Sequence, residues 1–132
     1  MNVLETEWWS LALPPEWWAE AEGDSILVGD RDGVGSIEIS TLHKEQGEFD
    51  PAEVAEIAAA DSGPEVVWQP VTLGEFAGVT SSYLEEDAAI REWYIANGGM
   101  MLFITYSCDA ENSGMDDAAV DELLDTLMAV TK

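Results

Sequence analysis

Alternation of hydrophobic and polar residues recurs along most of the chain and predicts β-strands. The clearest case is residues 36–40, where Ile37 and Ile39 flank Glu38. This pattern is typical of a strand that has one face on the core and the other in water. We predict further strands at residues 8–13, 17–22, 25–28, 66–68, 71–73, 79–84, 90–96 and 100–108.

Proline and glycine positions refine these strands. Pro70 predicts an edge strand or a bulge, because proline cannot donate to a β-ladder. Asn97-Gly98-Gly99 predicts a hairpin with a type I′ turn, which requires positive φ at both central residues. The strand after it, residues 100–108, is long and rich in residues that favour strands, so we expect it to be central in the sheet.

Two segments have helical signals. Asp50 is suited to the N-cap of a first helix and Pro51 to its first turn. Phe49 is placed to pack onto Val54, and the Gly-Pro pair at 63–64 is expected to end this helix.

The second helix is predicted near the C-terminus, with Asp116 as a capping residue. Its apolar residues follow helical spacing: Val120, Leu123, Leu124, Leu127 and Met128. Its acidic residues Asp117, Asp121 and Asp125 are interpreted as a solvated face, as is the acidic turn 85–87.

The resulting order is strands, helix, strands, helix. We therefore predict an α+β fold in which an antiparallel sheet packs with two main helices. The length of 132 residues and the absence of a repeat or linker predict one domain over residues 1–132.

Charge is the unusual property of the sequence. It has 28 acidic residues and four basic ones, which gives a net charge of -24. Nucleic acids and anionic membranes would be repelled, so neither is an expected partner. Two interpretations of this acidic charge stay open. An acid-rich surface suits a host that lives in brine or seawater, and it would also attract a basic protein.

The single cysteine, Cys108, allows no intrachain disulfide. The first residues have no basic and apolar pattern of a signal peptide, and no apolar run is long enough to span a bilayer. A cytoplasmic location is the expectation.

No residue pattern predicts catalysis, a metal site or a cofactor. His43, the single histidine, is interpreted as a strand-end residue, and Cys108 as a buried hydrophobic residue on the face of Leu102 and Ile104. The run Asp30-Arg31-Asp32-Gly33 is interpreted as a turn, because it lacks the further ligands of a calcium loop.

The tryptophans are the candidate interaction residues. Trp8-Trp9 and Trp17-Trp18 form adjacent pairs, and successive strand residues face opposite sides. Either one member of each pair points away from the core, or covering layers on both sheet faces bury all four. In the first case the exposed rings would be a binding surface.

Several segments together resemble the PsbP-like superfamily. They are LPPEW at 13–17, GSIEIS at 35–40, GEFAG at 74–78, EWY at 92–94 and LFITY at 102–106, followed by a closing amphipathic helix. The resemblance implies an antiparallel sheet between helices (an α/β sandwich) and binding rather than catalysis. Some bacterial relatives are chaperones for type VI secretion effectors.

The expected function is therefore a non-enzymatic protein-binding module or adaptor. In one version it resembles an effector chaperone and holds an apolar or amphipathic segment in an aromatic groove. In the other it is an immunity-type inhibitor that blocks a basic toxin by charge. A small-molecule-binding role or an enzyme is the less favoured alternative. A homodimer through the Trp8-Trp9 strand is a further option, if that strand is an edge.

Overall fold

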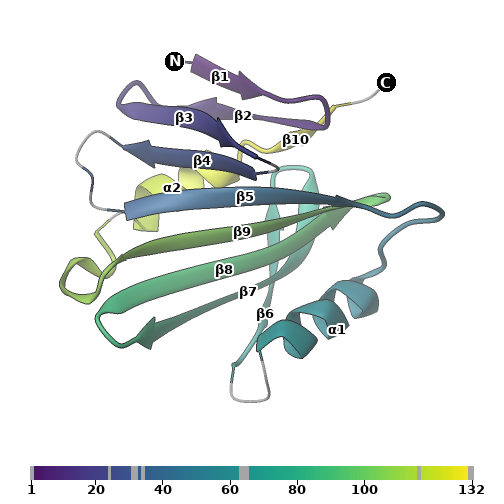
Figure 1. The fold of residues 1–132 in the computed structure, drawn as a ribbon. Helices are drawn as coiled ribbons and strands as arrows, with labels where there is room; N and C mark the ends of the chain where they lie inside the picture. The colour runs from purple at the N-terminus through teal and green to yellow at the C-terminus, as the bar shows by residue number, and fades with distance from the viewer. Residues whose placement is uncertain are drawn as a thin grey trace.

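A computed structural model describes residues 2–23, 25–30, 33, 35–62, 66–115 and 117–130. Within these residues an antiparallel sheet of seven strands dominates the fold (Figure 1). In spatial order its strands are β3 (Trp17–Glu22), β4 (Ser25–Asp30), β5 (Gly35–His43), β9 (Met100–Asp109), β8 (Ala88–Asn97), β7 (Phe76–Glu85) and β6 (Gln69–Leu73).

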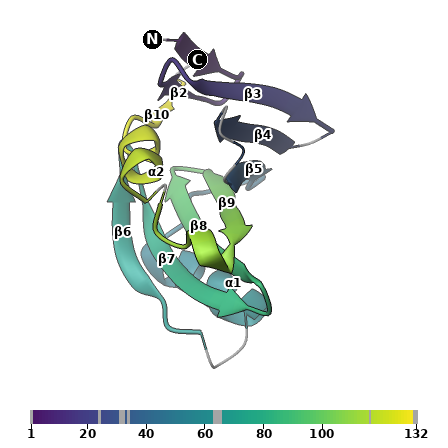
Figure 2. The same cartoon turned by 90° about the vertical axis from the view of Figure 1, so that its left-hand side faces the viewer.

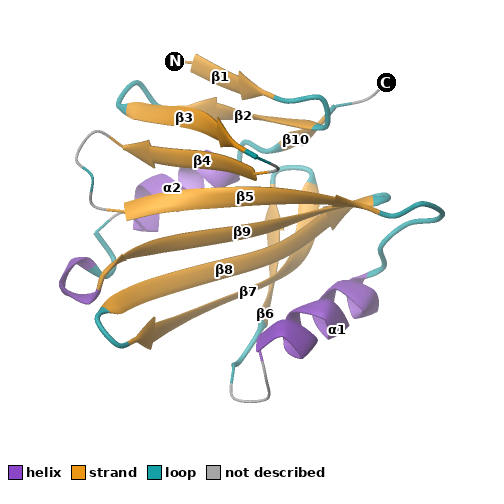
Figure 3. Cartoon of the chain, viewed as in Figure 1, coloured by secondary structure: helices purple, strands orange, loops and turns teal. Residues whose placement is uncertain are grey.

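A second, small antiparallel sheet lies beside the first. Its order is β1 (Asn2–Glu5), β2 (Trp9–Leu13) and β10 (Met128–Ala129), so it joins the two ends of the described chain (Figures 1 and 3). The helical elements are α1 (Pro51–Ser62), the short 3₁₀ turn η1 (Ala110–Asn112) and α2 (Asp117–Leu124). An α+β fold with a large antiparallel sheet and two main helices is therefore confirmed.

The inner face of the large sheet carries the main core. Alternate residues of β9 point into it, among them Leu102 and Ile104, and α2 covers them with Val120, Leu123 and Leu124. Strand β2 of the small sheet closes the rest of this face. Figure 2, turned by 90°, shows α2 on one side of β8 and β9.

Among the described residues, those that cover the outer face lie at one end of it. There α1 packs on β7 and β8, with Val54 and Ala58 buried against Tyr94 and Met101. The helix begins as predicted, because the Glu53 N–H donates to the Asp50 carboxylate at 2.8 Å and Phe49 joins this small core. The Gly-Pro pair predicted to end α1 lies outside the described residues.

Several strand predictions are confirmed. Strand β9 is central, between β5 and β8, and β6, which contains Pro70, is an edge of the large sheet. Ile37 and Ile39 are buried while Glu38 is exposed.

The β8–β9 hairpin forms with Asn97 paired to Met100, but its turn differs from the predicted type I′. Only Gly98 has positive φ (59°), whereas Gly99 does not. The preceding loop explains the difference, since the Lys44 and Phe49 N–H groups donate to the Gly99 and Gly98 carbonyls at 2.8 Å. These contacts constrain the turn from outside the hairpin.

The C-terminal helix is shorter than predicted. It ends at Leu124, and Met128 is exposed at 55% in β10 instead of on the helix. The Thr126 hydroxyl donates to the Leu123 carbonyl and accepts from the Ala12 N–H, which redirects the chain to pair with β2. The predicted cap, Asp116, lies outside the described residues.

Strand β2 is also not an edge, because β1 and β10 pair with its two sides. The premise for a homodimer through the Trp8-Trp9 strand was therefore wrong. The residues of β1 and β10 lack a clean alternating pattern, which is why the sequence did not predict these two partners.

Candidate functional site

The four candidate tryptophans divide into buried and exposed members. Trp9 and Trp17 are 1% and 8% exposed and belong to the main core, whereas Trp8 and Trp18 are 40% and 41% exposed. One member of each pair thus points away from the core, the first of the two arrangements considered from the sequence. Trp18 is exposed because it lies on the partly open outer face, whereas Trp8 precedes β2 and packs on His43.

The two exposed rings do not form one surface. Trp8 packs on His43 at the last position of β5, with ring centroids 4.3 Å apart. Trp18 lies on β3 in the same cross-strand row as Ser36 of β5. His43 and Ser36 are seven residues apart on β5, which is on the order of 23 Å along a strand. Trp8 and Trp18 therefore lie too far apart to line one groove together.

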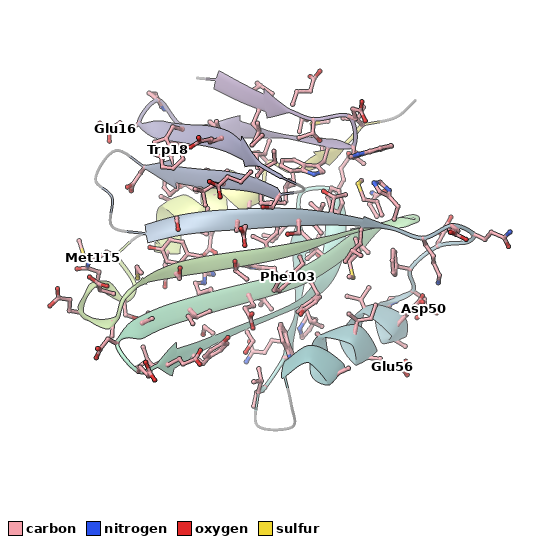
Figure 4. The ribbon with its side chains drawn as sticks, in the orientation of Figure 1. Glu16, Trp18, Asp50, Glu56, Phe103 and Met115 are labelled. Carbon is pink, nitrogen blue, oxygen red and sulfur yellow. The ribbon has the colours of Figure 1, made fainter. Side chains whose placement is uncertain are left out.

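Trp18 is held in place on the outer face. Its indole N–H donates to the Asp30 carbonyl at 3.2 Å, and its ring lies over Gly29, where a Cβ would come within 2.7 Å of the ring. Figure 4 labels Trp18 on β3 and Phe103 on β9, and it labels Asp50 and Glu56 to mark α1. We call the part of the outer face that α1 leaves uncovered the open half.

Three cross-strand rows make up the open half, as the strand register shows. From β3 to β7, the first row is Trp18, Gly29, Ser36, Ser107, Ile90 and Tyr83. The second is Glu20, Leu27, Glu38, Thr105, Glu92 and Ser81. The third is Glu22, Ser25, Ser40, Phe103, Tyr94 and Val79, and α1 covers its β7 end.

The second row, which we call the acidic row, carries three glutamates at regular intervals. Glu20, Glu38 and Glu92 are each separated by two strand spacings, or roughly 9.6 Å. Leu27 and Thr105 occupy the positions between them. The acidic row therefore presents negative charge at an even spacing on a partly apolar surface.

No described basic residue offsets this charge. Lys44 forms an ion pair beside α1. Its ammonium is 2.6 Å from the Glu53 carboxylate and 5.3 Å from the Phe49 ring centroid. Arg91 is on the inner face, 2.7 Å from Asp121. Both described cations thus satisfy the chain's own acids, and the described part of the open half stays negative.

At the β7 end of the open half, a hollow of about 490 Å³ lies between aromatic rings and carboxylates. Its lining includes Tyr83, Glu85, Glu92, Tyr94 and Phe103, and we call it the aromatic hollow. Tyr94 and Phe103 stack with centroids 4.7 Å apart. Burial raises the pKa of Tyr83 above its usual value, and the negative charge of the neighbouring Glu92 raises that pKa further.

The residues considered for catalysis are far apart. Cys108 pairs with Gly35 at one end of β5, and His43 is at the other end. Eight residues of strand separate them, on the order of 27 Å, so they form no nucleophile–base pair. Cys108 is buried on the face of Leu102 and Ile104, as predicted.

The other candidate clusters are accounted for locally. In the run at 30–33, the Gly33 N–H donates to the Asp30 carboxylate at 3.0 Å, while Arg31 and Asp32 lie outside the described residues. Asp117, Asp121 and Asp125 are exposed, as predicted for a solvated face, and the first two also pair with Arg91. Among the described residues, no group of three or more His, Cys, Asp or Glu side chains is arranged to hold a metal ion.

Sequence reasoning missed both the acidic row and the aromatic hollow. Their members are far apart along the chain and meet only through the strand register. The available signal was the polar or aromatic residue at alternate strand positions, such as Glu38 and Glu92. That pattern identifies an outward face but not which outward residues become neighbours.

No family model matches the chain, and neither does any curated protein. Solved structures do share its fold. A crystal structure from Bacteroides thetaiotaomicron VPI-5482 aligns with a TM-score of 0.67 and 19% identity, covering 95% of this chain and 46% of that one. The present chain thus spans about half of that protein's length.

A second similar structure is LpqN, described as involved in cell envelope biogenesis of Mycobacterium tuberculosis. Its TM-score is 0.62 at 16% identity, with 93% of this chain and 83% of LpqN covered. Identities this low show a common fold alone. In the described part of the present chain, no helix is long and apolar enough to cross a membrane.

Proposed function

We propose that the chain is a non-enzymatic protein-binding module that captures a basic segment of a partner protein on the open half of its outer face. The acidic row is the observation that carries this proposal. Opposite charges on a partner would steer its approach and fix its register on the sheet. We propose that this binding takes place in the cytoplasm. We also propose that the fold is a PsbP-like α/β sandwich, because α1 and α2 lie on opposite faces of the large sheet.

Capture by charge is favoured over an aromatic groove. An effector-chaperone-like groove would need the exposed tryptophans on one surface, but Trp8 and Trp18 lie at opposite ends of the sheet. The open half instead combines the carboxylates of the acidic row with half-buried Leu27 and Ile90. This combination suits a basic, amphipathic segment, the kind an immunity-type inhibitor would block.

The spacing of the acidic row indicates the shape of that segment. A helix lying along the row would rise 10.5 Å over seven residues, given about 1.5 Å per residue. Arginine or lysine at every seventh position would then face Glu20, Glu38 and Glu92 in turn. Apolar residues between them would meet Leu27 and the methyl group of Thr105.

Affinity capture from a lysate of the source organism tests the proposal. The bait would be the wild-type chain, a triple variant Glu20→Gln, Glu38→Gln and Glu92→Gln, and a control triple Glu45→Gln, Glu48→Gln and Glu56→Gln. The control acids are exposed and lie off the open half. Both triples change the net charge equally, from -24 to -21 (three charges removed).

We expect one basic protein to be retained by wild type and by the control triple, and to be lost from the acidic-row triple. Washing at about 0.5 M NaCl should also release it, because salt screens exposed charges. Equal retention by all three baits would refute capture by the acidic row. If no protein is retained at any salt, the charge is better explained as adaptation to a saline host.

A further inference from the structure

The aromatic hollow differs from the rest of the open half, because its Glu92 is half-buried beside aromatic rings. Tyr83 and Glu92 are diagonal neighbours across β7 and β8, and Glu92 and Phe103 are diagonal neighbours across β8 and β9. Diagonal partners are close enough for aromatic and long side chains to touch. One carboxylate is thus set between two rings.

We propose that the aromatic hollow is the binding site for a single arginine side chain of the basic partner. This inference rests on the proposed function, since the arginine belongs to the captured segment. A guanidinium is planar, so it can stack on the half-buried Phe103 ring while its N–H groups reach Glu92 and Glu85. Lysine would supply charge without the stacking plane.

The capacity of Glu92 permits this contact. A carboxylate offers about four acceptor positions, so Glu92 can accept from several donors at once. A hollow of about 490 Å³ exceeds the volume of one side chain, so the guanidinium enters together with water or with a neighbouring partner residue.

Nuclear magnetic resonance with three small probes tests the assignment on the full chain. The probes are the N-acetyl methylamides of arginine, lysine and citrulline, the last being a neutral analogue of arginine. We expect the arginine probe to shift the resonances of Tyr83, Glu92 and Phe103 saturably. The lysine probe should do so more weakly, and the citrulline probe should not.

Variants localise the effect. Glu92→Gln and Glu85→Gln should each lower the affinity for the arginine probe by roughly three- to tenfold. Glu22 is an acid of the outer face outside the hollow, so Glu22→Gln should leave this affinity unchanged. Glu85 is exposed, so its replacement tests the hollow without disturbing the fold. Shifts spread evenly over all acidic residues, or equal losses in the three variants, would overturn the assignment.

The two proposals fail separately. If the acidic row retains a basic protein but the arginine probe does not bind in the aromatic hollow, the arginine site is refuted and the protein-binding proposal is not. If the probe binds in the hollow but no basic protein is retained, the hollow is a guanidinium site and the proposal of a basic protein partner is refuted.

Discussion

At the scale of single residues, two glycines with the same backbone conformation differ in what surrounds them. Gly74 and Gly23 have φ of 58° and 59°. A Cβ on Gly74 would collide with the Leu127 backbone, whereas a Cβ on Gly23 would meet nothing within 4 Å. Gly74 is therefore where the β6–β7 turn touches the segment after α2.

We expect Gly74→Ala to lower the free energy of unfolding by roughly 3 kcal/mol, because backbone strain adds to a clash that the backbone cannot relieve. Gly23→Ala should lower it by about 1 kcal/mol, from strain alone. Urea denaturation of both variants measures the difference. Equal losses would mean that the close approach of Leu127 does not contribute.

Tyr83 provides a pH-dependent test of the aromatic hollow. Its pKa is raised first by burial and then by Glu92. A raised pKa means that the folded chain holds the proton more tightly, so this contribution to stability is present below a pH of about 10 and lost as pH rises through the folded-state pKa.

The difference in unfolding free energy between wild type and Tyr83→Phe should therefore shrink above a pH of about 10. Glu92→Gln should also lower the pKa of Tyr83, which a pH titration of the tyrosine ring resonances would detect. A pKa unchanged in Glu92→Gln would argue against contact between the two side chains.

At the scale of elements, the start of α1 depends on one side chain. The Asp50 carboxylate accepts the Glu53 N–H. We expect Asp50→Ala to destabilise the fold by about 1 kcal/mol. Glu56→Ala is the matched control, since it removes one exposed acid from the same helix without a cap (Figure 4). Thermal unfolding of the two variants separates the loss of the cap from the relief of charge repulsion that removing any acid gives. Similar unfolding midpoints for the two variants would contradict the capping role.

Elements with strong local signals could be predicted from the sequence, and elements defined by distant contacts could not. The alternation around Glu38 and the cap at Asp50 both depend on near neighbours. The early end of α2 depends instead on Thr126, which bonds to β2 more than a hundred residues earlier in the chain. The acidic row is the same kind of case, since only the register brings Glu20, Glu38 and Glu92 into line.

At the scale of the whole molecule, the net charge of -24 makes the folded state repel itself. Both described cations are already paired, so added salt provides the remaining screening. We expect the urea midpoint to rise between about 0.05 and 1 M NaCl, over which the Debye length falls from more than 10 Å to about 3 Å. A flat or falling midpoint would show that self-repulsion is not a major cost of folding.

The central claim is that the acidic row binds a basic segment, and calorimetric titration with a designed peptide tests it most directly. The probe is an amphipathic helix with arginine at every seventh position, compared with a peptide of the same composition whose arginines are shuffled. We expect the regular peptide to bind wild type and the control triple. Its affinity for the acidic-row triple should be about tenfold weaker or more, because three ion pairs are lost. Equal affinity of all three proteins for both peptides would contradict the claim.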